Sequence, residues 1–341
     1  MSLKDSYVLS QFTTWILQNG QLAKRELGWL LNSVGLKKKQ LVCPIFVREH
    51  GNKQYEIANM LDIAAIPLEE TTAQIQDLIE LGISSIMIFG LPAERDNVGS
   101  RAVSQNGIVQ NTVRKLKMEF GDAISILTDV CICQYNLSGH CGLFEGKNDL
   151  VDNDSTVRML SDIALTHAQA GADLVAPSAM MDGQVTSIRS SLDEHGYKKT
   201  KILSYSAKHF SSLYSPFRSV AFSKQIRDYK SLDKSSYQIP YSNLRESARK
   251  IENDIREGAD MVIVKPAIMY LDVISMVKEK FGFPIAAQTV SGEYAMIKSA
   301  ANNNWINENE WKVTSITAVK RAGADCIISY FCKDIAALLD R

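Results

Sequence analysis

The chain has 341 residues, of which 22% are charged, and its formal net charge is zero. This length allows one large α/β domain or two small ones, and the balanced charge favours a small molecule over nucleic acid or an anionic membrane as the partner. No basic N-terminal segment precedes a long apolar run, and no apolar stretch approaches the roughly 20 residues of a bilayer span. We therefore expect a soluble cytoplasmic protein.

Residues 1–40 have an irregular helical pattern and contribute no strand, so we interpret them as an N-terminal arm. From residue 41 onward, a short apolar run followed by a segment with helical spacing recurs eight times. The runs are LVCPIFV (41–47), SSIMIFG (84–90), AISILTDVCIC (123–133), ADLVAPSA (172–179), TKILSYSA (200–207), ADMVIVKPA (259–267), FPIAAQTVS (283–291) and ADCIISYF (324–331).

Eight strands alternating with helices predict an α/β fold, a (β/α)8 TIM barrel over residues 41–341. A doubly wound open sheet is the alternative, but no strand is followed by GxGxxG or GxxxxGK[ST]. The two long βα loops, residues 134–153 and 209–241, would lie on the active-site face of a barrel. The loop 209–241 is long enough to act as a lid.

Side chains with reactive groups end six of the eight predicted strands. They are Asp129, Cys131 and Cys133 on strand three, Ser178 on strand four, Lys208 just past strand five, Lys265 on strand six, Ser291 on strand seven and Tyr330 on strand eight. A barrel brings these strand ends to one rim, which is the arrangement expected of an enzyme.

Lys265 ends the buried-looking run MVIV and precedes a proline. Burial disfavours the ammonium form, so a fraction of the amine would be free to form a Schiff base with a carbonyl. The alternative is a lysine that reaches solvent or pairs with Asp272. Lys208 is predicted on the neighbouring strand, where each ammonium would lower the pKa of the other. This pairing favours a catalytic role for both lysines.

Six cysteines without a secretion signal argue against a disulfide framework. Three lie in or beside apolar runs and are interpreted as small buried hydrophobic residues: Cys43, Cys326 and Cys332. The other three, Cys131, Cys133 and Cys141, suit zinc and would leave a fourth position open for water or substrate. A closed four-ligand site with His140 and three reduced thiols without metal are the alternatives. The place of the cluster at a strand end favours catalytic zinc.

Five segments, DVCICQYNLSGHCG, APSAMMDGQV, SYSAKHFSSLYSPFR, GADMVIVKPAIMYLD and VSGEYAM, carry a resemblance to a known family. Over most of residues 41–335 the chain resembles porphobilinogen synthase, also called 5-aminolevulinate dehydratase. The resemblance implies a (β/α)8 barrel whose N-terminal arm builds a homo-oligomer, usually an octamer. It also implies condensation of two 5-aminolevulinate molecules into porphobilinogen with loss of two waters, a step of tetrapyrrole (heme) biosynthesis.

The resemblance also implies roles for individual residues. Lys265 would form the Schiff base with the first substrate and Lys208 would be its counterpart for the second, while the three clustered cysteines would bind zinc. Asp129 and Ser178 would hold the amino group of the first substrate, and Asp129 is also counted as catalytic. Ser291 and Tyr330 would bind the carboxylate of the first substrate, and Arg218 that of the second. Tyr205 and Gln238 complete the substrate-binding set.

Several residues depart from the family pattern. Lys234 replaces a second carboxylate-binding arginine, Gln288 replaces an active-site tyrosine, and Ser215 replaces a glycine of the lid. Lys250 stands where members with an allosteric magnesium carry a glutamate, so we expect that metal site to be absent. The arm lacks an arginine-rich run, which leaves the oligomer size open.

Two other functions are considered because of these departures. Lys234 and Gln288 both belong to the substrate-binding set, so a paralogue could condense a different aminoketone. An inactive metal-binding assembly protein is disfavoured, because both lysines and all three zinc-position cysteines are present.

Overall fold

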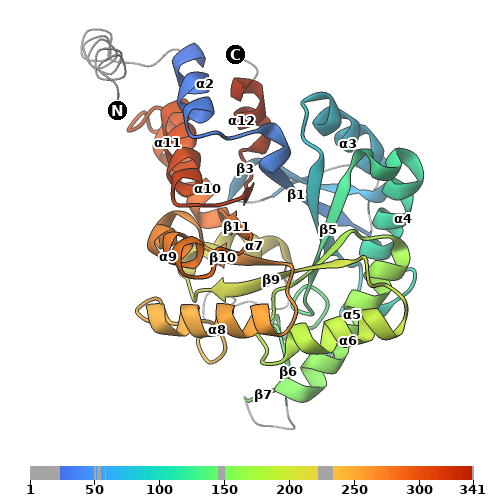
Figure 1. Ribbon diagram of the computed structural model, residues 1–341. Helices are drawn as coiled ribbons and strands as arrows, with labels where there is room; N and C mark the ends of the chain where they lie inside the picture. The colour runs from blue at the N-terminus through green and yellow to red at the C-terminus, as the bar shows by residue number, and fades with distance from the viewer. Residues whose placement is uncertain are drawn as a thin grey trace.

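The computed structural model describes residues 24–49, 51, 55–57, 59–144, 150–221 and 233–339. Eight parallel strands form a closed barrel with helices around it (Figure 1). The strands are β1 (Leu41–Arg48), β4 (Ser85–Leu91), β5 (Ser125–Val130), β8 (Leu174–Pro177), β9 (Lys201–Lys208), β10 (Met261–Lys265), β11 (Ile285–Gln288) and β12 (Cys326–Ile328). The barrel closes where Leu41 and Val42 of β1 pair with Ile327 and Ile328 of β12. The predicted fold is confirmed, and each of the eight predicted runs contains a strand. Several strands end sooner than predicted, so these residues follow a strand instead of ending it: Cys131, Cys133, Ser178, Ser291 and Tyr330. Lys208, predicted just past its strand, is the last residue of β9.

The apolar runs form strands because both faces of this sheet are covered. Side chains of one parity fill the barrel interior, among them Phe46, Leu203 and Ile263. Those of the other parity, such as Ile45 and Val264, pack against the helices. Reactive side chains that continue the inward parity beyond the strand ends therefore meet above this filled interior.

The covering helices are α3 (Thr71–Glu80), α4 (Ile108–Phe120), α5 (Asn153–Ala170), α6 (Gln184–Glu194), α8 (Leu244–Arg256), α9 (Leu271–Phe281), α10 (Ser291–Asn302), α11 (Glu308–Arg321) and α12 (Cys332–Leu339). Several begin at a polar side chain that accepts a backbone N–H, as Asp152 does from Ser155 at 3.0 Å and Asn307 does from Glu310 at 3.1 Å. None of the helices in the described ranges has the length and apolar character of a bilayer span.

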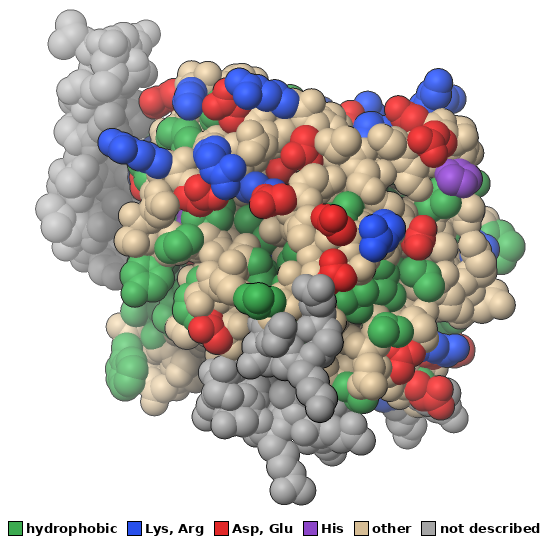
Figure 2. Space-filling view, turned by 90° about the horizontal axis from the view of Figure 1, so that it is seen from below, with side chains coloured by type: hydrophobic (Ala, Val, Ile, Leu, Met, Phe, Trp, Pro, Cys, Tyr) green, Lys and Arg blue, Asp and Glu red, His purple; other side chains and the backbone are tan. Residues whose placement is uncertain are grey.

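The helix α2 (Lys24–Ser33) packs on α11 and α12 of its own barrel and buries Leu27 and Leu31 (Figure 1). Residues 1–23 of the predicted arm lie outside the described residues, so the arm stays a prediction. On the face shown in Figure 2, acidic and basic side chains are interspersed. This mixing agrees with the zero net charge.

Additional elements decorate the barrel. A hairpin of β2 (Tyr55–Ile57) and β3 (Met60–Pro67) adds to the edge of β1, where the sequence predicted no strand. The loop after β5 contains β6 (Leu143–Phe144) and β7 (Val151–Asp152), and the loop after β9 contains the short helices η5 (Ser212–Tyr214) and α7 (Ser215–Ala221). The other short helices are η1 (Lys38–Gln40), η2 (Leu68–Glu70), η3 (Ser100–Val103), η4 (Gly121–Ala123) and η6 (Ile268–Tyr270).

Candidate active site

Lys208 and Lys265 occupy paired positions at the ends of β9 and β10. Both are buried, with 7% and 9% of their surfaces exposed. The Lys265 amine lies 5.1 Å from the ring centre of Tyr205 and 5.4 Å from that of Tyr214. Lys265 therefore does not reach solvent in the way the alternative interpretation required.

The two amines differ in their protonation. Burial, followed by repulsion from the Lys208 ammonium, lowers the pKa of Lys265 to about 7. Burial also acts to lower the pKa of Lys208, but the negative charges of Cys141, Cys131 and Cys133 outweigh it and raise that pKa. Repulsion from Lys208 thus lowers the pKa of Lys265 as expected, whereas the net shift of the Lys208 pKa is upward, because the charges of the cysteine cluster outweigh burial.

Cys131, Cys133 and Cys141 form a buried cluster whose sulfur atoms all lie within 4.8 Å of one another. The sulfurs of Cys131 and Cys133 are 3.3 Å apart. Hydrogen bonds from these two thiols lower the pKa of Cys141 well below its usual range. The hydrogen bond with Cys133, followed by that with Cys141 and by burial, raises the pKa of Cys131. A tetrahedral ion with Zn–S bonds of about 2.3 Å separates sulfurs by about 3.8 Å. The donor set and its spacing therefore fit zinc.

His140 does not join this cluster. Its Nδ1 lies 3.1 Å from the Tyr237 hydroxyl, and its ring packs edge-on against Phe144 at 4.9 Å. Among the described residues, the candidate metal ligands that converge are the three cysteines alone. The arrangement favours the open three-cysteine site over the closed site with His140.

Both lysines and two of the three cysteines line a small cavity of about 40 Å³. Its wall consists of Cys133, Cys141, Lys208, Lys265, Tyr214, Phe217, Arg218, Lys234 and Gln238. Arg218 Nη2 and Gln238 Oε1 have no hydrogen-bond partner, and the same holds for Asp129 Oδ1 and Gln288 Oε1 at the ends of β5 and β11. Buried polar atoms are nearly always paired, so this group indicates a site built for a polar ligand.

The first part of the predicted lid covers the barrel mouth. The Tyr214 hydroxyl donates to the His209 carbonyl at 2.8 Å, and Ser291 Oγ accepts from the Phe217 N–H at 3.0 Å. A Cβ at Gly292 would lie 2.5 Å from the Leu213 carbonyl oxygen, so only glycine allows this close approach of α10 to the lid. Residues 222–232 of the predicted lid lie outside the described residues.

Five predicted substrate residues do not line the cavity, namely Gln288, described above, and four others. The Ser178 carbonyl accepts a hydrogen bond from the Lys208 amine, and the Tyr205 hydroxyl donates to Met87 Sδ at 3.1 Å. Ser291 is bonded to the lid, and the Tyr330 ring stacks on Phe46 at 6.2 Å. The substrate contacts of these residues stay predictions.

Only one of the two carboxylate oxygens of Asp129 has a hydrogen-bond partner. Its Oδ2 accepts from Gln134 Nε2 at 2.8 Å, while burial raises the pKa of the carboxyl group despite the Gln134 and Ser178 hydrogen bonds and the nearby Lys208 charge. A carboxyl group with a raised pKa beside two lysines can hold and return a proton.

Sequence reasoning missed four residues that shape this site: Gln134, Tyr214, Phe217 and Tyr237. Gln134, Tyr214 and Phe217 lie inside the segments that carried the resemblance and Tyr237 lies between two of them, but none is a reactive type at a strand end. Phe217 packs on Phe46 and Phe89, with ring centres 5.8 and 5.6 Å apart. Those segments could have suggested the first three residues, whereas the contacts of all four depend on how the loops fold.

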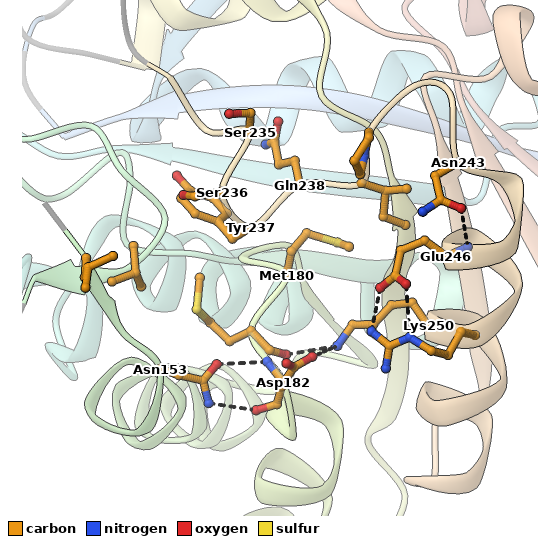
Figure 3. Close-up of a pocket in the computed structure, with 16 residues that line it drawn as sticks. Asn153, Met180, Asp182, Ser235, Ser236, Tyr237, Gln238, Asn243, Glu246 and Lys250 are labelled. Atoms are coloured by element: carbon orange, nitrogen blue, oxygen red, sulfur yellow. Dashed lines mark hydrogen bonds and ion pairs between the residues drawn. The ribbon is translucent and has the colours of Figure 1, made fainter.

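A larger pocket of about 520 Å³ lies on the other side of residues 235–240, beside α8 (Figure 3). Gln238 borders both this pocket and the small cavity. Here the buried Lys250 amine lies 3.2 Å from the Met181 carbonyl oxygen, 3.2 Å from Asp182 Oδ1 and 3.6 Å from Asp254 Oδ1. An ammonium group thus occupies the centre of these oxygens.

Fold and site together define a barrel enzyme with a lysine pair and a thiol cluster at the C-terminal ends of its strands. The family model for delta-aminolevulinic acid dehydratase matches residues 21–338. The chain therefore belongs to the delta-aminolevulinic acid dehydratase family, whose members are lyases.

Individual relatives agree with this assignment. A delta-aminolevulinic acid dehydratase of Archaeoglobus fulgidus is 45% identical over 94% of this chain and 97% of its own length. One from Halalkalibacterium halodurans is 41% identical over 88% of this chain and 89% of its own. The crystal structure of the Toxoplasma gondii enzyme in complex with porphobilinogen, its reaction product, superposes with a TM-score of 0.85 at 36% identity, covering 89% of this chain and 85% of that one.

Proposed function

We propose that this protein condenses two 5-aminolevulinate molecules into porphobilinogen through Schiff bases on Lys265 and Lys208. The observation that carries this proposal is the paired position of the two buried amines next to the three thiols. The family relationship and the name of the Toxoplasma complex support the substrate and the product. They also favour 5-aminolevulinate over a different aminoketone and an enzyme over an assembly protein.

Lys265 begins the reaction, since a pKa of about 7 leaves a large share of its amine unprotonated at neutral pH. The free amine attacks the ketone carbon of the first substrate, and the carbinolamine then loses its oxygen as water. Asp129 and the Lys208 ammonium lie close enough to shift the pKa of Lys265. Either group can supply the proton with which the departing oxygen leaves as water. Lys208 must give up its proton before it can capture the second substrate.

Cys131, Cys133 and Cys141 would hold zinc, which when bound supplies positive charge that orients the second substrate's amine or activates water. Arg218 is the carboxylate-binding group of the cavity, because its Nη2 has no other hydrogen-bond partner there. Ser291 and Tyr330 are proposed for the carboxylate of the first substrate. Phe217 and Tyr214 exclude water from the Lys265 amine.

Lys250 gives the protein independence from an allosteric magnesium ion. Its ammonium lies among the oxygens of Met181, Asp182 and Asp254, where a divalent cation would be repelled. We further propose a cytoplasmic homo-oligomer, an octamer by family resemblance. The cytoplasm would keep the six cysteines reduced.

The deciding experiment is an assay of pyrrole formation from 5-aminolevulinate, with zinc and with a chelator. We expect product with zinc, loss of product with the chelator, and no stimulation by magnesium. Borohydride should trap one substrate on Lys265, and Lys265→Met should abolish the adduct. The absence of pyrrole from pH 6 to 9 with zinc present would overturn the proposal.

A further inference from the structure

Lys234 lies beside the thiol cluster. Its side chain is 4% exposed, and its amine is 3.3 Å from Cys141 Sγ, within hydrogen-bond distance for sulfur. A charged side chain thus contacts a candidate zinc ligand directly.

The backbone around Lys234 fixes this position. The Lys234 carbonyl accepts the Gln238 N–H at 3.0 Å, which closes a turn. From the same turn, the Tyr237 hydroxyl accepts the Cys141 N–H at 3.2 Å. Residues 234–238 therefore dock on the Cys141 segment through Tyr237 as well as through the amine (Figure 3 shows 235–238).

The charges explain why an ammonium is useful here. Three thiolates around a divalent zinc ion carry one net negative charge, and the cysteines are 1%, 5% and 1% exposed. A buried charge without a partner is costly. One ammonium at the Lys234 position makes the group neutral overall.

We propose that Lys234 is the charge partner of the zinc centre, stabilising the metal-loaded cysteines through its N–H···S contact with Cys141. This inference rests on the proposed function, which supplies the zinc. It changes the role of Lys234 from that of a carboxylate-binding group to a residue that tunes the metal. A compact ammonium matches one sulfur atom, whereas the planar fork of a guanidinium matches a carboxylate.

The test measures the zinc dissociation constant of the full-length protein by competition with a chromogenic chelator. Lys234→Met should raise this constant about 10- to 100-fold, and Lys234→Arg, which keeps the charge, should restore most of the affinity. Lys312→Met is the matched control: Lys312 is also buried, but it pairs with Asp334 at 2.8 Å on the outer helices. That variant should bind zinc like the wild type.

Steady-state kinetics at saturating zinc separate the two roles of Lys234. Because Lys234 also borders the cavity, we expect the KM of Lys234→Met for 5-aminolevulinate to rise, but by a smaller factor than the zinc dissociation constant. An unchanged zinc constant together with a raised KM would overturn this inference and leave the proposed function intact. A wild-type protein that takes up no zinc would overturn the metal role and this inference with it. Melting curves of the zinc-free proteins check folding, and Lys234→Gln replaces the methionine variant if that variant unfolds.

Discussion

Lys265 illustrates how one buried charge sets the reactivity of a neighbouring one. It pairs with Lys208 across β9 and β10, and burial and repulsion from the Lys208 ammonium act in the same direction on its pKa. The thiolates act on Lys208 with the opposite sign. One lysine is thus prepared to attack while its neighbour keeps a proton.

The rate of Schiff-base trapping at Lys265 should therefore depend on pH. Because the pKa is lowered to about 7, the free amine increases as the pH rises through 7 and is nearly complete above it. Borohydride trapping with 5-aminolevulinate should rise between pH 6 and 8 and then level off. A rate that still climbs at pH 9 would contradict the lowered pKa.

Lys208→Met provides the matched variant for this profile. Removing the Lys208 ammonium removes a repulsion that lowers the pKa of Lys265, so the profile should move to higher pH. Identical profiles in both proteins would show that burial alone sets the Lys265 pKa.

At the residue scale, the sequence could predict the lysine pair and the cysteine triad, because the parallel strands of a barrel bring both groups to the same rim. It could not predict the raised pKa of Lys208, which depends on thiolates that come from another strand and another loop. The contact of Lys234 with Cys141 was hidden for the same reason, since 93 positions separate the two residues.

At the scale of elements, the turn that follows β10 is held by a buried carboxylate. Glu293 of α10 accepts the backbone N–H of Ile268 at 2.7 Å and that of Val290 at 2.6 Å. Burial raises the pKa of this carboxyl group to about 7. Glu293 thereby joins the segment after Lys265 to the start of α10, which also carries the lid contact of Ser291.

Glu293→Gln should weaken this connection. The amide keeps one acceptor, so one backbone N–H loses its partner, and the free energy of unfolding should fall by about 1–3 kcal/mol. Urea unfolding at pH 8 measures the loss, and borohydride trapping at Lys265 should become slower. Glu119→Gln, on an exposed position of α4, is the control and should change neither quantity. Equal stability of Glu293→Gln and the wild type would refute the role of Glu293.

The elements that the sequence predicted are those with continuous apolar runs. The β2–β3 hairpin was missed because much of β3 is exposed or half-buried, so its residues carry no clear period. The short helix α7 was also missed, since its seven residues are stabilised by contacts with α10 more than by their own pattern.

For the whole molecule, the layer between strands and helices contains a buried histidine. His167 of α5 faces Thr128 of β5, with Nδ1 3.0 Å from Thr128 Oγ1, and burial lowers its pKa to about 3. In the unfolded chain a histidine has a pKa of about 6.5. The stabilisation that comes from a neutral His167 is therefore complete above pH 6.5 and decreases as the pH falls toward 3.

His167→Gln should reduce the acid sensitivity of the fold. At pH 5 the wild type should have lost about 2 kcal/mol of stability at this site relative to pH 7. The variant lacks that proton uptake, so its loss between pH 7 and 5 should be smaller by this amount. Urea unfolding at both pH values gives the comparison, and parallel losses in the two proteins would contradict the assignment.

Eight repeated units predicted parallel strands with helical crossovers, which fit either a closed barrel or a doubly wound sheet, and the lack of a nucleotide-binding glycine motif favoured the barrel. Closure itself depends on pairing between the first and last strands, Leu41 with Ile327, which no local pattern encodes. The sequence also could not predict that α2 packs on its own barrel, since Leu27 and Leu31 could equally have packed against another subunit.

The contact between α2 and α12 brings the first and last helices of the described chain together (Figure 1). Since β1 and β12 also pair, the order of units around the barrel has no physical beginning. A circular permutant that links α12 to α2 and opens the turn between α6 and β9 would keep every strand pair of the barrel. The order in which the ribosome delivers the units is therefore separable from the architecture that they form.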